Sequence, residues 1–318
     1  MRFALLGLAL LLTGFVLTSS LCALAVAWLY RRHVPSSAAG LLAVRLLPTA
    51  CGLVSALVLL GSYLRYEPRV TDEPFPFGVL FTAATALALL ALAARRAVQS
   101  FCLTRHLVAE WRRHGEPIQL PGTRLPAFVV AHEFPVVAVV GIVRPVLFVA
   151  RQVLARLAPE ELQAVTAHEA GHLAARDNLR DMLMRCAPDW LALTRLHVRL
   201  QSAWSAAAEC DADDYATRRG AAPLALAGAL IQVAKLVPPG ARLRLPASAF
   251  HDGEELTPRV MRLLVRSGDH TLDVPPRRRL RAWLLASLAV VLLALSLAPR
   301  TLLAVHEASE AGLELLRF

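Results

Sequence analysis

The stretch that decides how this chain folds and what it holds is His168-Glu169-Ala170-Gly171-His172. On a helix, residues four apart project from one face, so His168 and His172 can bind one metal ion together. Two imidazoles at this spacing suit a tetrahedral Zn²⁺. Glu169 lies beside them and can take a proton from a metal-bound water, which makes it the candidate general base. A helical glycine costs about 1 kcal/mol relative to alanine, so Gly171 predicts that another part of the chain packs close there.

An acidic pair downstream completes the candidate metal site. Glu209 and Asp213 have the ExxxD spacing within an alanine-rich stretch, residues 203–216, that predicts a helix. Glu209 is the expected third zinc ligand, and the fourth position of a His₂Glu site is left open for water. Asp213, one turn later, can hold a ligand histidine in the tautomer that the metal needs. Asp177 is a second candidate for this support; alternatively it begins the next helix. One Zn²⁺ per chain is therefore expected.

Composition predicts a membrane protein. Hydrophobic residues make up 56% of the 318-residue chain, and charged residues only 18%. A membrane-spanning helix needs about 20 predominantly apolar residues. Four uncharged apolar runs are of this order: 3–30, 46–64, 74–94 and 282–299. The first run has small residues typical of a signal-peptide cleavage site, but it stays apolar as far as Tyr30, which favours a retained membrane helix.

The segment between the third and fourth runs is long enough for a core of its own. Valine-rich stretches bounded by Pro or Gly predict strands at 126–131, 135–140 and 145–149. Helical patterns follow at 151–157, 159–175, 178–196, 203–216, 223–237 and 257–265. Pro188 predicts a kink or a break in the third of these helices.

The predicted fold class is an integral membrane protein, mainly α, with four transmembrane helices and an α+β zincin-like metallopeptidase domain between spans three and four. The expected organisation is three membrane helices in 1–97, the zinc domain in 98–280, the fourth membrane helix in 281–300 and a short tail in 301–318.

Arginines predict how the chain is oriented, because positive residues gather on the cytoplasmic side of membrane proteins. Arginine pairs follow the first run at 31–32 and the third at 95–96, and a cluster at 277–281 precedes the fourth. The N-terminus is therefore expected outside and the zinc domain in the cytoplasm. Arg45 lies near the inner end of the second run and is expected to snorkel to the interface; a functional charge within the membrane is the alternative.

The formal net charge is +10, and Lys235 is the single lysine. Nucleic-acid binding is one interpretation of such a charge. Topology and anionic lipids explain it more simply, because the arginines gather where the predicted spans meet the inner side. No nucleic acid is expected as a partner. The five cysteines lack CxxC spacing and predict free thiols in a reducing compartment.

The order of the motifs resembles a known family. Gly141-x-x-Arg144-Pro145 is followed by Ala158-Pro159-Glu160-Glu161-Leu162, by HExxH, by Asp177 and by Glu209-x-x-Ala212-Asp213. This order is similar to that of the membrane zinc endopeptidases typified by the BlaR/MecR antibiotic-sensing transducers, whose zinc domain also lies between spans three and four. The related HtpX/CAAX-type membrane peptidases share HExxH and a downstream Glu but place their spans differently.

The resemblance implies that His168, His172 and Glu209 bind zinc, that Glu169 is the catalytic base, and that the protein lies in a bacterial inner membrane. The transducers continue past span four into a large extracellular penicillin-binding sensor domain. This sequence ends at Phe318, so no sensor and no antibiotic sensing are expected.

The predicted function is that of a zinc metalloendopeptidase cleaving a cytoplasmic or membrane-proximal protein, such as a transcriptional repressor. The alternatives are an HtpX-like peptidase that clears damaged membrane proteins, and a non-catalytic scaffold or receptor component with structural zinc. Glu169 argues against the scaffold, because a structural site needs no base. His251 and Arg262 are candidates for a second oxyanion-stabilising group, or else plain surface residues. A strand within 126–149 is a candidate edge for an extended peptide substrate.

Overall fold

A computed structural model describes residues 2–32, 34–67, 77–120, 122–123, 125–237, 253–267 and 298–315. The predicted fourth span, 282–299, lies almost wholly outside these ranges, and so does His251. The described part of the chain is mainly helical, as predicted from the sequence.

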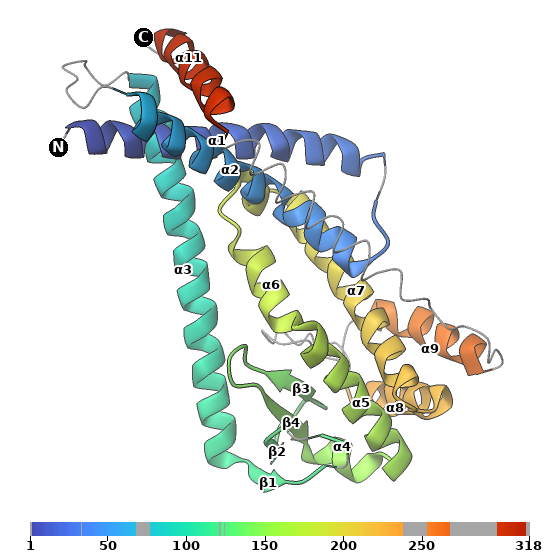
Figure 1. The fold of residues 1–318 in the computed structure, drawn as a ribbon. Helices are drawn as coiled ribbons and strands as arrows, with labels where there is room; N and C mark the ends of the chain where they lie inside the picture. The colour runs from blue at the N-terminus through green and yellow to red at the C-terminus, as the bar shows by residue number, and fades with distance from the viewer. Residues whose placement is uncertain are drawn as a thin grey trace.

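Three helices are long and apolar enough to cross a membrane, and they cover the first three predicted spans apart from residues 74–76, which lie outside the described residues. They are α1 (Arg2–Tyr30), α2 (Ala38–Tyr66) and α3 (Phe77–His114). Glycines let α1 and α2 approach closely: a Cβ on Gly7 would strike the Tyr63 ring, and one on Gly52 would lie 2.8 Å from the Phe15 carbonyl oxygen. Figure 1 shows α1 and α2 together at one end of the molecule, with α3 running away from them.

Helix α3 continues well past the predicted end of its span at residue 94. Its 38 residues measure about 57 Å, nearly twice the thickness of a hydrocarbon core of about 30 Å. The prediction followed apolar residues alone, whereas the polar residues after Arg95 remain good helix formers. At the far end, the Trp111 ring packs edge-on against Phe148, with centroids 5.1 Å apart. One helix thus connects the membrane layer to the core of the following domain.

A four-stranded sheet begins that domain. Its strands are β1 (Glu116–Ile118), β2 (Ala127–Val130), β3 (Val137–Val140) and β4 (Val146–Ala150). Their order is β1-β2-β4-β3; β2 and β4 are parallel and the other neighbours antiparallel. The three valine-rich strands were predicted, whereas β1 was not, because Glu-Pro-Ile shows no strand pattern. Because β3 comes last in the order of the described strands, it lies at an edge of this sheet.

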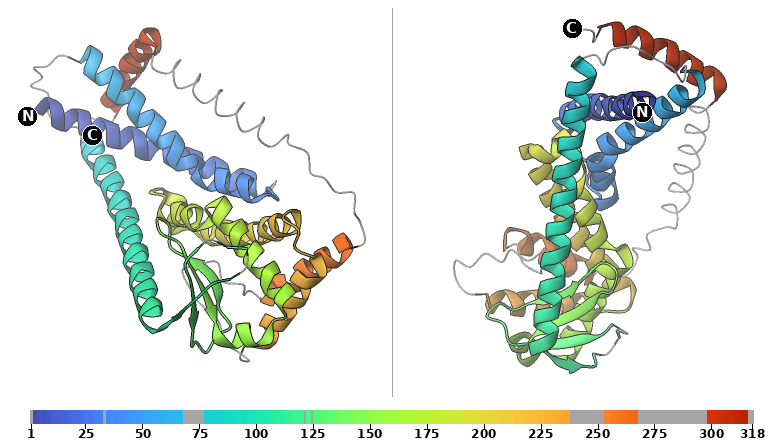
Figure 2. Two further views of the ribbon diagram at one scale, coloured as in Figure 1. Left: turned by 60° about the horizontal axis from the view of Figure 1, so that its bottom comes forward. Right: turned by 90° about the vertical axis from the view of Figure 1, so that its left-hand side faces the viewer.

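Helices follow the sheet along the chain. They are α4 (Arg151–Arg156), α5 (Pro159–Ala175), α6 (Asp177–Cys186), the 3₁₀ helix η1 (Trp190–Leu193), α7 (Arg195–Arg218), α8 (Pro223–Lys235) and α9 (Gly253–Ser267). A further helix, α11 (Pro299–Leu315), packs on α2. Both views in Figure 2 show the sheet at the end of α3 that is distant from α1 and α2, whereas α6 and α7 extend back and contact α2.

The predicted helix at 178–196 is in fact broken, as Pro188 suggested. Helix α6 ends at Cys186, and residues 195 and 196 already belong to α7. Proline lacks an amide hydrogen and clashes with the preceding turn, so a helix cannot continue through it undisturbed. The helix predicted at 203–216 is part of α7, which begins eight residues earlier, at Arg195.

The expectation that Arg45 snorkels to the membrane interface is wrong. Arg45 and Asp189 are both fully buried, and Arg45 Nη1 donates to both carboxylate oxygens of Asp189, at 3.0 and 2.8 Å. Thr49 Oγ1 also donates to Asp189, and Arg45 Nε donates to His197 Nδ1 at 3.1 Å. A charged side chain can remain ionised in the protein interior when it is paired with an opposite charge and hydrogen-bonded. This pair joins α2 to the connection between α6 and η1.

Candidate metal centre

Close contact between α5 and α7 brings the metal-binding motifs together. A Cβ on Gly171 would lie 3.1 Å from Ala212 Cα and 3.2 Å from Tyr215 Cβ. The close packing predicted at Gly171 is therefore confirmed, and the neighbour is helix α7. Gly171 lies between His168 and His172 in the sequence. Its contact with α7 therefore places both histidines opposite the acidic motif of that helix.

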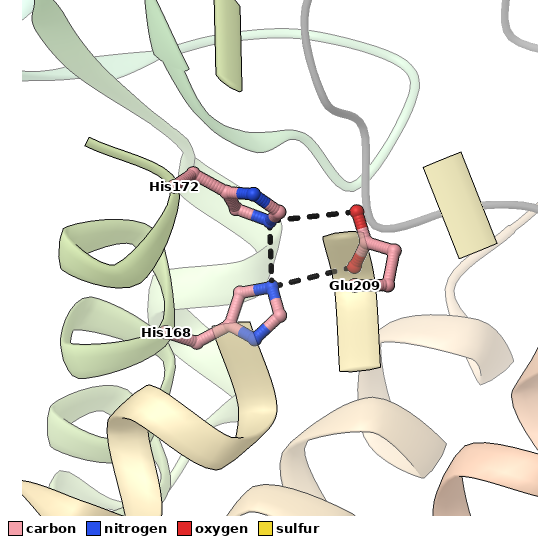
Figure 3. A group of neighbouring side chains, drawn as sticks. All are labelled: His168, His172 and Glu209. Atoms are coloured by element: carbon pink, nitrogen blue, oxygen red, sulfur yellow. Dashed lines mark hydrogen bonds and ion pairs between the residues drawn. The ribbon is translucent and has the colours of Figure 1, made fainter. Parts of the chain in front are cut away.

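His168, His172 and Glu209 point toward a common centre, as Figure 3 shows. The two Nε2 atoms are 3.1 Å apart. Glu209 Oε2 lies 3.4 Å from His168 Nε2, and Glu209 Oε1 lies 3.4 Å from His172 Nε2. All three side chains are buried. The structure thus brings the three predicted ligands into one cluster.

Two further carboxylates set the tautomers of the histidines. His168 Nδ1 lies 2.9 Å from Asp213 Oδ1, and His172 Nδ1 lies 2.8 Å from Asp177 Oδ2. A carboxylate accepts a hydrogen bond, so each Nδ1 carries the proton and each Nε2 presents a lone pair to the centre. Asp177 reaches His172 because Arg176 adopts a left-handed backbone, with φ of 56°, that turns the chain sharply after α5.

The donor set fits a zinc ion. Zn–N and Zn–O bonds of about 2.0–2.1 Å in a tetrahedral site put the ligand atoms about 3.3 Å apart. The three measured separations are 3.1, 3.4 and 3.4 Å. With both Nδ1 atoms protonated, the two Nε2 lone pairs and the carboxylate repel one another unless a cation lies between them. These three residues are therefore suited to hold Zn²⁺.

The electrostatics of the cluster also favour a cation. Burial pulls the pKa of His172 down, but the Glu209 charge and the hydrogen bond to Asp177 together hold that pKa well above its usual value. Burial pushes the pKa of Glu209 up, but His172 and the contacts with His168 and Arg259 hold it well below its usual value. The buried site thus stabilises positive charge on its nitrogens and negative charge on its carboxylate.

Glu169 lies on α5 next to the histidine pair and is 1% exposed. Its Oε2 accepts a hydrogen bond from the Val139 amide of β3 at 3.0 Å, and among the described residues its Oε1 has no hydrogen-bond partner. Burial raises the pKa of Glu169. A carboxylate with a raised pKa is better matched to proton transfer near neutral pH.

Arg259 of α9 is a site residue that the sequence did not reveal. It is 5% exposed, and its Nη1 lies 2.8 Å from Glu209 Oε2. Its Nε and Nη2 donate to the two oxygens of Asp213, at 3.0 and 2.7 Å. One guanidinium therefore fixes both acidic residues of the ExxxD motif, which is the bidentate geometry that favours Arg over Lys.

Of the two predicted candidates for an oxyanion-stabilising group, Arg262 and His251, the structure describes only Arg262. Arg262 Nη2 donates to the Cys210 carbonyl at 2.7 Å, and its Nη1 lies 3.0 Å from Asp214 Oδ1. Arg262 therefore ties α9 to α7, and its Nη2 also lies 3.6 Å from Asp213 Oδ2. His251 lies outside the described residues.

A cavity of about 250 Å³ opens beside His172 and the edge strand β3. Val139 and Gly141 line it together with Asn178 of α6. Asn178 Nδ2 donates to the carbonyl oxygens of Val139 and Gly141, at 2.9 and 3.0 Å. The edge of the sheet, the metal cluster and a cavity thus meet in one place.

One other group of three potential ligands occurs in the described part of the chain. Ligand atoms of Glu67, His306 and Glu310 lie within 4.8 Å of one another. Glu310 is exposed and the other two are half-buried. The group is far less enclosed than the His168 cluster, whose three residues are all buried.

Comparison with known protein families supports the interpretation of this site. A model described as peptidase family M48 matches residues 104–270, which is just over half of the chain. The matched region contains the sheet, both histidines, Glu209 and Arg259. A comparison with curated proteins gave no match. The match supports a membrane-type metallopeptidase but does not single out the BlaR/MecR-type transducers. The chain belongs to peptidase family M48, and it is a membrane metallopeptidase.

Proposed function

We propose that the protein is a zinc-dependent endopeptidase with one Zn²⁺ per chain, held by His168, His172 and Glu209. The observation that carries the proposal is the ligand cluster: three buried donors 3.1–3.4 Å apart, with both histidine tautomers set by carboxylates. Membership of a peptidase family supports peptide hydrolysis as the reaction.

In this proposal Glu169 is the general base. When bound, Zn²⁺ supplies a positive charge that lowers the pKa of water to about 7 and polarises the scissile carbonyl. Glu169 takes the proton of the attacking water and delivers it to the leaving amine. Asp213 and Asp177 hold the histidines in the tautomer that binds metal. Arg259 acts through Glu209 and Asp213 as a positioning residue.

The substrate is proposed to bind as an extended strand along β3. In this antiparallel hairpin the Val139 amide and carbonyl point away from β4, and they engage Glu169 and Asn178 instead. A substrate carbonyl that accepts the Val139 hydrogen bond takes it from Glu169 Oε2, which frees that oxygen for proton transfer. Binding through the main chain demands an extended segment and gives little side-chain selectivity.

Two classes of substrate fit this site. The resemblance to the BlaR/MecR-type transducers favours a cytoplasmic or membrane-proximal protein such as a transcriptional repressor. The surface beside the cavity favours a second class, damaged membrane proteins with unfolded apolar segments. Ile142 lines the cavity and the neighbouring Val143 is 82% exposed, so apolar side chains are available to such segments. Glu169, buried beside the ligand pair, supports either peptidase over a structural zinc site.

The experiment is a comparison of cellular proteomes that contain either the wild-type protein or the Glu169→Gln variant at equal levels. Fragments with new termini are expected only with the wild type, and their parent proteins identify the substrate class. A single repressor favours signalling, whereas many membrane proteins favour quality control. Identical fragments in both cells would remove the peptidase proposal.

We also infer that the protein lies in a bacterial inner membrane with the zinc domain in the cytoplasm, as the arginine distribution supports. A reporter that is active only in the cytoplasm is expected to be active when fused after Arg113 and inactive when fused at Phe318. The reverse pattern would place the zinc domain outside the cell.

A further inference from the structure

The connection between α6 and α7, residues 187–194, exposes apolar side chains in a regular way. Its centre is the 3₁₀ helix η1, in which residues three apart eclipse one another. Trp190 and Leu193 are such a pair, and they are 42% and 52% exposed. Between them, Leu191 and Ala192 are buried. The connection thus has an inner side that packs and an outer side with a large aromatic and an aliphatic residue.

The inner side of this connection is fixed to all three described membrane helices. Leu191 packs among apolar residues of α1, and Asp189 pairs with Arg45 of α2. The carbonyl of Ala192 accepts a hydrogen bond from Arg96 of α3 at 3.3 Å. In Figure 1, α6 rises toward the layer of α1 and α2, and α7 descends from it. The peptidase domain therefore returns to the membrane layer at η1.

The elements next to η1 in the fold and in the sequence, α1 and α7, carry exposed apolar and basic residues. The lipid-facing side of α1 is apolar as far as Leu24 and Trp28, which are 69% and 54% exposed. Arg31 and Arg32 follow at the end of α1 and are exposed. On α7, Arg195 and Arg199 are also exposed, one turn apart. Tryptophan near the end of an apolar span, with arginine beyond it, is typical of a membrane interface.

We propose that η1 is a second membrane contact, in which Trp190 and Leu193 insert into the leaflet on the side of the α1–α2 loop. Arg195 and Arg199 then meet the head groups of anionic phospholipids in that leaflet. The occupant is a lipid leaflet, because η1 is fixed to the three described membrane helices and its exposed side chains, Trp190 and Leu193, are apolar. In the proposed orientation this is the inner leaflet.

The contact sets the distance between the membrane and the metal cluster. Helix α6 has ten residues, about 15 Å, between Asp177, which holds His172, and the connection. An extended chain covers that distance in about five residues. If the proposed peptidase function holds, the site cuts peptide bonds only a few residues from the membrane surface. The lipid contact itself does not depend on that function.

The test uses the full-length protein at one chain per nanodisc, in phosphatidylcholine with phosphatidylglycerol. Brominated acyl chains quench the fluorescence of tryptophans that touch them. The emission of Trp190 is obtained as the difference between the wild type and Trp190→Phe, and that of Trp204, which is 4% exposed, from Trp204→Phe as control. The Trp190 component is expected to be quenched by bromolipid and shielded from aqueous iodide, and the Trp204 component to be quenched by neither.

Two results would overturn the proposal. Quenching of Trp190 by iodide and not by bromolipid would place η1 in water. Quenching by neither reagent would mean that protein covers Trp190. Because each disc holds one chain, a contact between two copies is not a source of protection in this experiment.

The role of the two arginines is tested with Arg195→Gln combined with Arg199→Gln. In the mixed lipid this variant is expected to lose part of the bromolipid quenching of Trp190, and to behave the same in phosphatidylcholine alone as in the mixture. Arg218→Gln combined with Arg219→Gln, at the opposite end of α7, is the matched control and is expected to retain the wild-type response. An equal response of both double variants would refute the role given to Arg195 and Arg199.

Discussion

Gly171 is a point of close contact between α5 and α7, and replacing it with alanine is expected to weaken zinc binding. The added Cβ would lie 3.1 Å from Ala212 Cα and 3.2 Å from Tyr215 Cβ, whereas ordinary contacts begin at 3.4 Å. Neither atom is the flexible end of a side chain, so the helices themselves must separate. A movement of about 0.3–0.5 Å restores ordinary contact.

The size of the effect follows from two opposing terms. Overpacking a close contact costs about 1–3 kcal/mol. Replacing a helical glycine with alanine returns about 1 kcal/mol. The net destabilisation is therefore about 0–2 kcal/mol. Because the histidines are on α5 and Glu209 is on α7, separating the helices lengthens both 3.4 Å ligand distances. The propensity gain is the same with and without zinc, so zinc must pull the helices back together against the overpacking cost of about 1–3 kcal/mol, and its affinity is expected to fall about 5–150-fold.

The assay is competition for zinc between the purified full-length protein in detergent and a chelator of known affinity. Gly228→Ala is the matched control, because its Cβ would meet Glu161 Oε1 at 2.6 Å, the end of a flexible side chain that caps the first turn of α5, far along the helix from Gly171. This control is expected to bind zinc like the wild type and to gain up to about 1 kcal/mol of stability. Wild-type affinity in Gly171→Ala, or an equal loss in both variants, would refute the reasoning.

Three further predictions concern residues around the site and the membrane helices. Asp213→Asn is expected to bind zinc about 10–100-fold more weakly in the same competition assay, because it weakens the support of a ligand histidine. Arg45→Met is expected to lower the free energy of unfolding in detergent by about 3–5 kcal/mol, because Asp189 is left buried and unpaired, and adding Asp189→Leu should recover part of that loss. Burial and the Arg45 charge lower the pKa of His197 to about 4 from its usual 6.5, so protonation favours the unfolded state. Thermal stability is therefore expected to fall as the pH drops from 6.5 toward 4, and to fall less in His197→Asn.

Local periodicity explains why the core of the site was predictable. Histidines four apart share a helix face wherever that helix lies, and the same holds for Glu209 and Asp213 on α7. The structure brings both motifs together and adds the contacts of His168 with Asp213 and of His172 with Asp177. Gly171 also allowed one tertiary contact to be predicted, because a glycine in the middle of a helix often marks a place where another segment packs closely.

The contacts that escaped prediction join residues far apart in the sequence. Arg259 lies 46 residues after Asp213, among many other arginines, and no spacing rule connects the two. Arg45 lies 144 residues before Asp189, so its side chain was expected at the interface instead of in a buried pair. The hydrogen bond from Val139 to Glu169 likewise depends on how β3 packs against α5. Each contact is decided by tertiary packing, which short sequence patterns do not encode.

The central claim is tested most directly by measuring zinc content and cleavage of a fluorescent unfolded protein on the same preparations. The wild type is expected to hold one zinc and to cleave. Glu169→Gln is expected to keep its zinc and lose about 10²–10⁴-fold in rate, because glutamine cannot accept the proton. Glu209→Gln should lose zinc as well as activity, whereas His306→Ala, in the second ligand group, should lose neither. Cleavage by Glu169→Gln at the wild-type rate, or stoichiometric zinc in Glu209→Gln, would contradict the account.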